Sequence, residues 1–216
     1  MISSSIEARS LGASLLAFIA LLGPSMLCYP GGDHFDATGT HYRFWQNFLC
    51  DLLLLKAMNG EPNSLGAMLA AVGALQLMIF GLMPLWWRTR TCPRWTRTTG
   101  ALSTSFSALM CAQVMLDLPI THAVLTLLFG GFGVLASLPV FIDQCRCPQT
   151  PAIVTWTGAT ALGSAVGGAV LYGSTKWAGL DGMLWLPGVQ KVALLATLLW
   201  LITLINPRST RTSPAG

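Results

Sequence analysis

The sequence predicts an all-α protein, a single bundle of six transmembrane helices formed by residues 1–216. Three observations support this fold class. Of the 216 residues, 53% are hydrophobic and 9% are charged, whereas about 25% of the residues in a soluble domain are charged. The chain contains six apolar stretches close to the ~20 residues that a helix needs to cross a bilayer core of ~30 Å. Arginine is concentrated between these stretches on one side of the predicted membrane.

Each apolar stretch is expected to be helical, because a lone strand cannot satisfy its backbone polar groups in lipid. The predicted spans are Leu11–Tyr29, Leu65–Trp87, Thr99–Leu118, Thr121–Ile142, Ala152–Gly173 and Leu184–Ile205. Only Pro119 and Ile120 separate the third span from the fourth, so these two spans must form a tight antiparallel hairpin.

The loops between the spans differ in their content of basic residues. With six spans, both termini share one side, and that side holds Arg9, Arg88, Arg90, Arg94, Arg97, Arg146, Arg208 and Arg211. The other side holds Arg43, Lys56 and Lys176. Cytoplasmic loops carry the excess of basic residues, so we expect a cell-membrane protein with both termini in the cytoplasm. Membrane lipids are the partners that this pattern favours, and nucleic acid is not.

The longest segment outside the spans is an outer loop, residues 30–64. From His41 to Leu55 its aromatic residues and leucines recur every three or four positions, which predicts a short amphipathic helix at the membrane interface. The loop also carries four residues of metal-binding types, Asp33, His34, Asp36 and His41. Their spacing matches no metal motif, so we expect no metal ion and no cofactor. The polar tail, residues 206–216, is predicted to be disordered.

Ionisable and amide side chains gather in the outer half of the predicted bundle. Lys191 lies ~10 Å below the outer end of the sixth span, at ~1.5 Å per residue. A charge at this depth needs a partner or an aqueous cavity, so we expect Lys191 to pair with Asp51 or Asp117. Such an ion pair either holds two helices together or forms part of a ligand-binding pocket that has Trp45 in its lid. The residues expected at the pocket are Asp51, Asp117, His122, Lys191, Gln190, Gln113 and Trp45.

Two further sets of residues are candidates for close contacts. Cys28 and Cys50 both fall on the outer side and could form a disulfide in an oxidising compartment. In the fifth span, Ala159, Gly163 and Gly167 recur at four-residue spacing. Small residues on one helix stripe let two helices approach closely. Gly163 and Gly167 are therefore expected either to pack inside the bundle or to form a homodimer interface.

Two short motifs flank the outer loop, Tyr29-Pro30-Gly31-Gly32 and Asn47-Phe48-Leu49-Cys50-Asp51-Leu52. They resemble motifs of a six-helix membrane protein family of unknown function that is found mainly in prokaryotes and is similar to the DRAM, FRAG and SFK proteins. That family usually has serine at the position of Cys50 and glycine at that of Leu53. The resemblance implies a six-helix bundle and marks Asp51, Asp117 and His122. It implies no reaction.

The expected function is the binding of a lipid or small amphiphile in the outer leaflet, without catalysis. A lipid-modifying enzyme, hydrolase or transferase, is the first alternative, because an acid and an imidazole meet at the membrane edge. Intramembrane hydrolases of the alkaline-ceramidase type are less similar, since they need more than the three histidines of this chain. A small transporter is the second alternative, but the sequence shows no inverted repeat and no pair of proline-broken helices.

Overall fold

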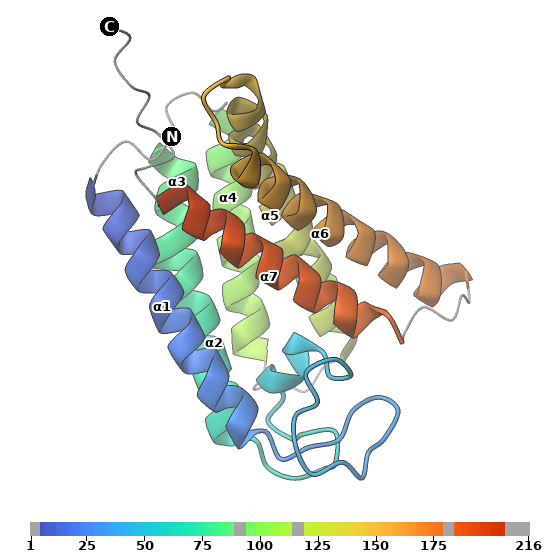
Figure 1. The fold of residues 1–216 in the computed structure, drawn as a ribbon. Coiled ribbons are helices and arrows are strands. Elements are labelled where there is room, and N and C mark those ends of the chain that lie inside the picture. Colours follow the sequence, from blue (N-terminus) through green and yellow to red (C-terminus); the bar gives the residue numbers. More distant parts are fainter. Residues whose placement is uncertain (1–4, 89–93, 114–118, 179–183, 206–216) are drawn as a thin grey trace, which may run out of the picture.

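The computed structural model describes residues 5–88, 94–113, 119–178 and 184–205 (Figure 1). In these residues the elements are helical and no β-strand is formed, so the all-α prediction is confirmed. The helices follow in the order α1 (Ser5–Cys28), η1 (Leu49–Leu53), α2 (Ser64–Gln76), η2 (Leu77–Leu82), α3 (Met83–Arg88), α4 (Arg94–Gln113), α5 (Pro119–Arg146), α6 (Ala152–Ala178) and α7 (Leu186–Ile205). The predicted disordered tail, residues 206–216, lies outside the described residues.

The long helices run alternately up and down (Figure 1). Since α2, η2 and α3 follow one another without a break, they form one rod that lies along α1. The helix α4 packs along α5, and α6 packs along α7. The start of α1, the end of α7 and the connection between α5 and α6 lie at one end of the bundle. The segment between α1 and α2, residues 29–63, folds over the opposite end, and we call it the cap.

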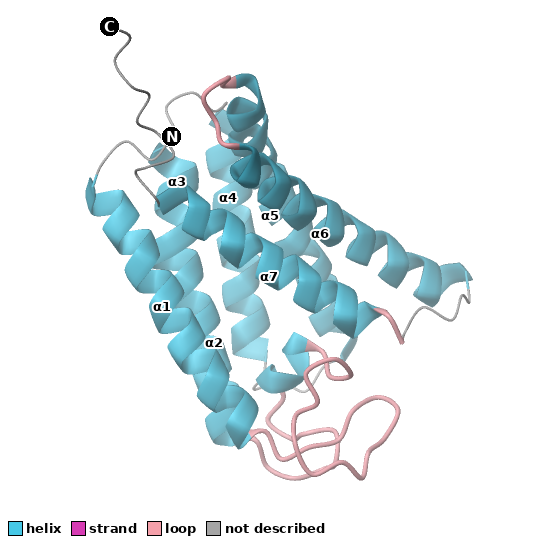
Figure 2. Ribbon diagram, in the orientation of Figure 1, coloured by secondary structure: helices cyan, strands magenta, loops and turns pink. Residues whose placement is uncertain are grey.

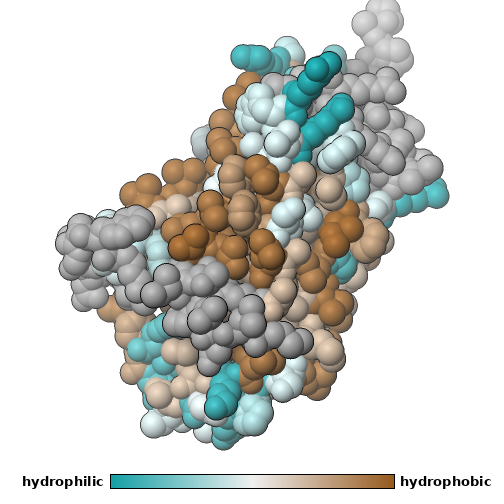
Figure 3. Space-filling model, turned by 180° about the vertical axis from the view of Figure 1, so that it is seen from behind, coloured by the Kyte–Doolittle hydropathy of each residue, from teal (hydrophilic) through white to brown (hydrophobic). Residues whose placement is uncertain are grey.

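Within the residues that the structure describes, five helices are long and apolar enough to cross a membrane. They are Ala8–Cys28, Ser64–Trp87, Val124–Arg146, Ala152–Thr175 and Leu186–Ile205, which match five of the six predicted spans to within a few residues at each end. Figure 3 shows the corresponding surface, an apolar belt between two more hydrophilic ends. The described part of the third predicted span belongs to α4, which is not among the five.

The helix α4 is less apolar because it carries several hydroxyl side chains, and the most buried of them face neighbouring helices. Ser103, Thr104 and Ser107 are all buried. The Ser103 hydroxyl donates a hydrogen bond to the backbone oxygen of Phe129 on α5, at 2.9 Å. The Thr104 hydroxyl donates to the backbone oxygen of Gly100, one turn earlier, at 3.0 Å. The hydroxyls of Ser103 and Thr104 are thus bonded to the backbone of α5 and of α4 itself.

Polar contacts also join α1 to the middle of the neighbouring rod, where η2 is a stretch of π-helix. Pro84 has no N–H to offer the carbonyl of Phe80, four residues earlier. The Ser10 hydroxyl of α1 donates to that Phe80 oxygen at 2.8 Å. The side-chain amide of Gln76, at the end of α2, donates a hydrogen bond to the backbone oxygen of Ser14 on α1, at 2.8 Å. These bonds hold α1 against the π-helical stretch.

The glycines that allow close helix packing are not the ones that the sequence spacing singled out. A Cβ atom added at Gly163 or Gly167 would meet no other atom within 4 Å. A Cβ atom at Gly158 would lie 2.8 Å from the ring of Phe141 on α5, and one at Gly100 would lie 2.6 Å from the ring of Trp86 on α3. Gly163 and Gly167 therefore do not pack inside the bundle, and the homodimer interface stays a prediction.

Candidate functional site

The cap is a folded unit that is anchored on the end of the bundle. Leu52 of η1 is fully buried, at 0% exposure. It packs in one cluster with Tyr29 of the cap, Ala70 of α2 and Met110 of α4. The amphipathic helix expected between His41 and Leu55 is reduced to the five residues of η1, and the rest of this stretch forms turns and extended chain (Figure 2). That part of the prediction is wrong, because side chains of the cap bind its backbone groups.

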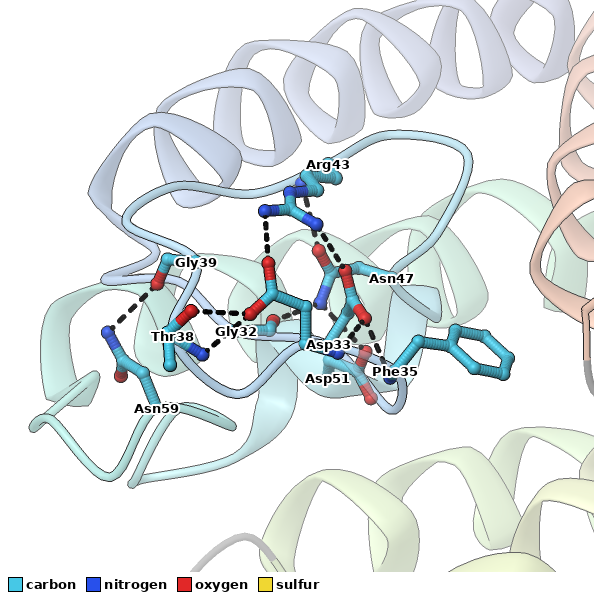
Figure 4. A network of polar contacts seen from close by, with 10 residues as sticks. Gly32, Asp33, Phe35, Thr38, Gly39, Arg43, Asn47, Asp51 and Asn59 are labelled. Carbon is cyan, nitrogen blue, oxygen red and sulfur yellow. Dashed lines mark hydrogen bonds and ion pairs between the residues drawn. The ribbon is translucent and has the colours of Figure 1, made fainter.

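Asn47 is the centre of these side-chain bonds, and its side chain is buried (Figure 4). Its amide nitrogen donates to the backbone oxygen of Gly32, at 2.6 Å, and to Oδ2 of Asp51, at 3.2 Å. Its amide oxygen accepts from the backbone N–H of Arg43, at 2.8 Å. One side chain therefore links three separate parts of the cap. Such local bonds compete with helix formation.

The acidic residues of the cap are also engaged. Arg43 donates to Oδ2 of Asp33, at 3.3 Å, and to Oδ2 of Asp36, at 2.6 Å. The other oxygen of Asp33 accepts from the backbone N–H groups of Phe35 and Asp36. These carboxylates thus have partners within the cap. Within the described ranges of the chain, no group of three or more histidine, cysteine, aspartate or glutamate side chains could hold a metal ion.

Asp51 lies buried in η1 with its two oxygens in different surroundings. Its Oδ2 accepts from the backbone N–H of Phe48, at 2.8 Å, and from Asn47. Its Oδ1 lies 3.9 Å from Nε2 of His34, whose side chain is 37% exposed. The imidazole ring also meets the ring of Phe48 edge to face. The cap therefore places a buried carboxylate, that of Asp51, near a solvent-accessible imidazole, that of His34.

Lys191 on α7 is the most deeply buried charged residue of the site, at 0% exposure. Its ammonium donates to the backbone oxygen of Asn47. It also lies 5.6 Å from the ring centre of Tyr42 and 5.5 Å from that of Phe44, within the range of cation–π attraction. The preceding residue, Gln190, accepts from the backbone N–H of Leu49 at 2.7 Å. Two consecutive residues of α7 thus hold the cap.

The direct ion pair expected between Lys191 and an acid is not formed with Asp51. Among the described residues, no carboxylate lies within 4.0 Å of the Lys191 ammonium. The Asn47 carbonyl accepts a hydrogen bond from the ammonium instead, while the side chain of the same asparagine donates to Asp51. Lys191 and Asp51 therefore attract each other across Asn47 without touching. The other candidate partner, Asp117, lies outside the described residues.

The structure brings together Asp51, Gln190 and Lys191 of the predicted site. Trp45 is 56% exposed and meets the ring of Phe44 edge to face, and its place in the lid stays a prediction. The side chains of Gln113 and His122 lie outside the described residues, as Asp117 does. Cys28 and Cys50 are free thiols. The sequence did not predict the contacts of Asn47, His34 and Tyr42. Asn47 is nevertheless the first residue of the motif that ends with Asp51-Leu52, and this was the signal that could have identified it.

Burial changes the acidity of several groups in the cap. It raises the pKa of Asp51 above its ordinary value, against the opposing effect of the hydrogen bonds from Asn47 and Phe48. Desolvation likewise raises the pKa of Tyr29 to about 12 and that of the Cys50 thiol to about 12. The pKa of Asp36, at the surface, is lowered to about 2 by hydrogen bonds from Thr38 and Arg43. Burial therefore makes ionisation of Asp51, Tyr29 and Cys50 less favourable.

Two carboxyl groups of the cap should change its stability in opposite directions when the pH is lowered. The folded-state pKa of Asp51 lies above its ordinary value of 3.8, so protonation favours the folded cap as the pH falls toward that value. The pKa of Asp36 lies below 3.8, so its stabilising contribution is present above that pH and is lost as the pH falls through about 2. We expect cap stability to rise as the pH is lowered toward about 4 and to fall below it.

Carbon-13 NMR titration of the aspartate carboxyl groups measures both pKa values, with D51N and D36N assigning the signals. A midpoint for Asp51 below 3.8 would show that hydrogen bonding outweighs burial there.

No family model, curated protein or solved structure matches the chain. The resemblance carried by the two cap motifs therefore stays a prediction.

Proposed function

We propose that the chain is a six-pass protein of the cell membrane that binds the anionic head of a lipid or other small amphiphile beneath the cap. In this proposal the cap lies at the outer leaflet. Both termini are cytoplasmic, because the basic residues gather at the opposite end of the bundle. The binding is not catalytic. Its central residue is Lys191, with Gln190 and Asp51 beside it.

Membrane insertion of α4 as a sixth pass is supported by its position and its hydrogen bonds. It lies along α5 and also contacts α2 and α3. Its buried hydroxyls, at Ser103 and Thr104, already have acceptors, so they add little cost to burial in lipid. A helix that would be too polar alone is then stable inside a bundle.

One observation carries the proposed binding function, the buried ammonium of Lys191. It lies in an apolar helix, and in the described part of the chain no acid touches it. A buried charge without a touching counter-ion is costly, and ionisable residues within membrane helices commonly mark binding or transport sites. An anionic headgroup would supply the missing charge. Its oxygen would replace the Asn47 carbonyl as acceptor, and the cap would move to admit it.

The shape of the surroundings favours an amphiphile over a fully polar ion. The aromatic rings of Tyr42 and Phe44 flank the ammonium, and the helix below it is apolar. A ligand with a charged head and an apolar body would leave few polar atoms unpaired at this position.

Native mass spectrometry of the full-length protein in detergent tests the proposal with oleate and lysophosphatidic acid as probes. Monoolein, which has a similar apolar chain but a neutral head, is the control ligand. We expect the wild type to retain both anionic probes in preference to monoolein. K191M should lower their affinity about tenfold or more, because a hydrogen bond to a charged group is lost. K191R keeps the charge and should retain part of the binding.

Three results would each count against the proposal. The first is that the wild type retains monoolein as well as the anionic probes, and the second is that it retains none of them. The third is that correctly folded K191M binds the anionic probes as the wild type does.

A second candidate, a lipid-modifying enzyme, is favoured by one observation, the pair of His34 and Asp51. Its Nε2–Oδ1 distance is 3.9 Å, so the two groups would have to move together, or share a bridging water, for the carboxylate to orient the imidazole for proton transfer. The same experiment separates the two functions if 1-oleoyl lysophosphatidic acid is the probe, because water that cleaves its acyl ester would release oleate and glycerol 3-phosphate, and the spectrometer detects both. Release that depends on His34 would favour the enzyme, and intact probe would favour binding.

A further inference from the structure

A second charged surface lies at the end of the bundle opposite the cap, and the proposed function does not use it. Among the side chains that the structure describes, four arginines at this end are exposed, Arg9, Arg94, Arg97 and Arg146. Large exposed aromatic side chains accompany them, Trp87, Trp95 and Trp156. We call these seven residues the basic rim. It borders the apolar belt of Figure 3.

The arginines of the rim that lie closest together in sequence are Arg94 and Arg97, in the first turn of α4. Residues three apart lie on the same face of a helix, so both guanidinium groups can approach one ligand. Neither forms an ion pair with an acid in the part of the chain that the structure describes. Asp143, on α5 at the same end, is half-buried and has a contact of its own. The positive charge of this turn is therefore not neutralised by its described neighbours.

The corner between α3 and α4 is tightly packed beneath this turn. Trp86 of α3 is buried and lies against Gly100 of α4, where a Cβ atom would come within 2.6 Å of its ring. Two buried polar atoms at this corner, Nε1 of Trp86 and Oγ1 of Thr96, have no hydrogen-bond partner among the described residues. Unpaired buried polar atoms are unfavourable, and a bound oxygen atom would satisfy them. Rigid packing and unpaired donors are both features of a binding site.

The geometry points to a binding site for the phosphate of an anionic phospholipid at the α3–α4 corner, formed by Arg94 and Arg97 with Trp95 at the acyl boundary. Charge complementarity favours this occupant, since guanidinium groups bind phosphate oxygens through paired hydrogen bonds. Exposed tryptophan beside arginine is typical of the level at which phospholipid headgroups lie. This inference depends on the membrane location proposed above, but not on any ligand at Lys191.

Competition between two lipids measures the site directly. The full-length protein in detergent is mixed with equal amounts of phosphatidylglycerol and phosphatidylcholine that have identical acyl chains, and native mass spectrometry counts the bound lipids. We expect the wild type to retain phosphatidylglycerol in preference. R94Q combined with R97Q should reduce that preference by about fivefold for each arginine removed. R94K combined with R97K keeps both charges and should retain most of it.

Control variants separate a local site from a general effect of charge. Lys56 is exposed at the capped end, so K56Q removes a charge far from the rim and should leave the preference unchanged. Because Lys191 is itself proposed to bind an anionic head, the comparison is repeated in the K191M background, where R94Q combined with R97Q should lower the preference by the same factor as in the wild type. The inference is overturned if the wild type shows no preference, if the double glutamine variant keeps it, or if K56Q lowers it equally.

A second measurement covers the case in which the double glutamine variant does not fold. The wild-type preference should then decline steadily as salt is added, because exposed charges are screened. A preference that high salt leaves intact would also contradict the assignment.

Discussion

Replacing Lys191 with alanine is expected to destabilise the protein by about 2–5 kcal/mol, the range for truncating a large buried side chain. The lysine is fully buried, so K191A leaves a cavity between α7 and the cap. It also leaves the Asn47 carbonyl without the donor that now binds it. Both effects loosen the same contact. Thermal unfolding in detergent, followed by circular dichroism, measures the loss.

K191M is the matched control for this prediction. Methionine fills much of the same space and removes the cost of burying a charge, which offsets the loss of one hydrogen bond. Exchanging buried charges for apolar residues of similar volume is often neutral or stabilising. We therefore expect K191M to lie within about 1 kcal/mol of the wild type. Equal losses for K191A and K191M would show that the ammonium, and not the volume of the side chain, holds the cap.

The second large effect is expected at Gly32, in the first part of the cap. Its φ is +79°, and an added Cβ would lie 2.4 Å from the backbone nitrogen of Asn59. The left-handed backbone alone costs an alanine about 1–2 kcal/mol. A clash with backbone atoms adds about 1–3 kcal/mol, because they cannot rotate away as a side chain can. Gly32 also supplies the oxygen that the side chain of Asn47 binds, so we expect G32A to disrupt that network.

Gly60 provides a control with the same backbone conformation but no clash. Its φ is +87°, and a Cβ atom there would meet nothing within 4 Å. G60A should therefore cost only the backbone term, about 1–2 kcal/mol. Hydrogen–deuterium exchange of cap peptides reports on both variants. Faster exchange in G32A than in G60A is expected, and similar exchange in the two would refute the role assigned to the clash.

The apolar pattern of the sequence predicted most of the fold correctly. Five spans were located to within a few residues at each end, because long apolar stretches permit few structures other than helices in lipid. The pattern described α4 less well. A count of polar residues cannot show that Ser103 and Thr104 face inward and are already hydrogen-bonded.

The candidate site was predictable only in part, because its contacts depend on the conformation of the cap. The predicted depth of Lys191 in the membrane marked it as a residue that needs a partner, and its proximity to Asp51 was expected. The sequence could not show that a backbone carbonyl, that of Asn47, would be the acceptor. The spacing of aromatic residues after His41 resembled a helix, yet side-chain bonds to the loop backbone were more favourable.

The π-helical stretch η2 has a consequence for the far end of its rod. A π turn contains about one residue more than an α turn, so the helix that follows is rotated by ~100° about its axis relative to an uninterrupted α-helix. In that rotated setting Trp86 faces Gly100. An uninterrupted α-helix over the same residues would point the indole ring elsewhere. The one extra residue of the π-helical stretch thus orients the ring of Trp86 toward α4, the helix that begins with Arg94.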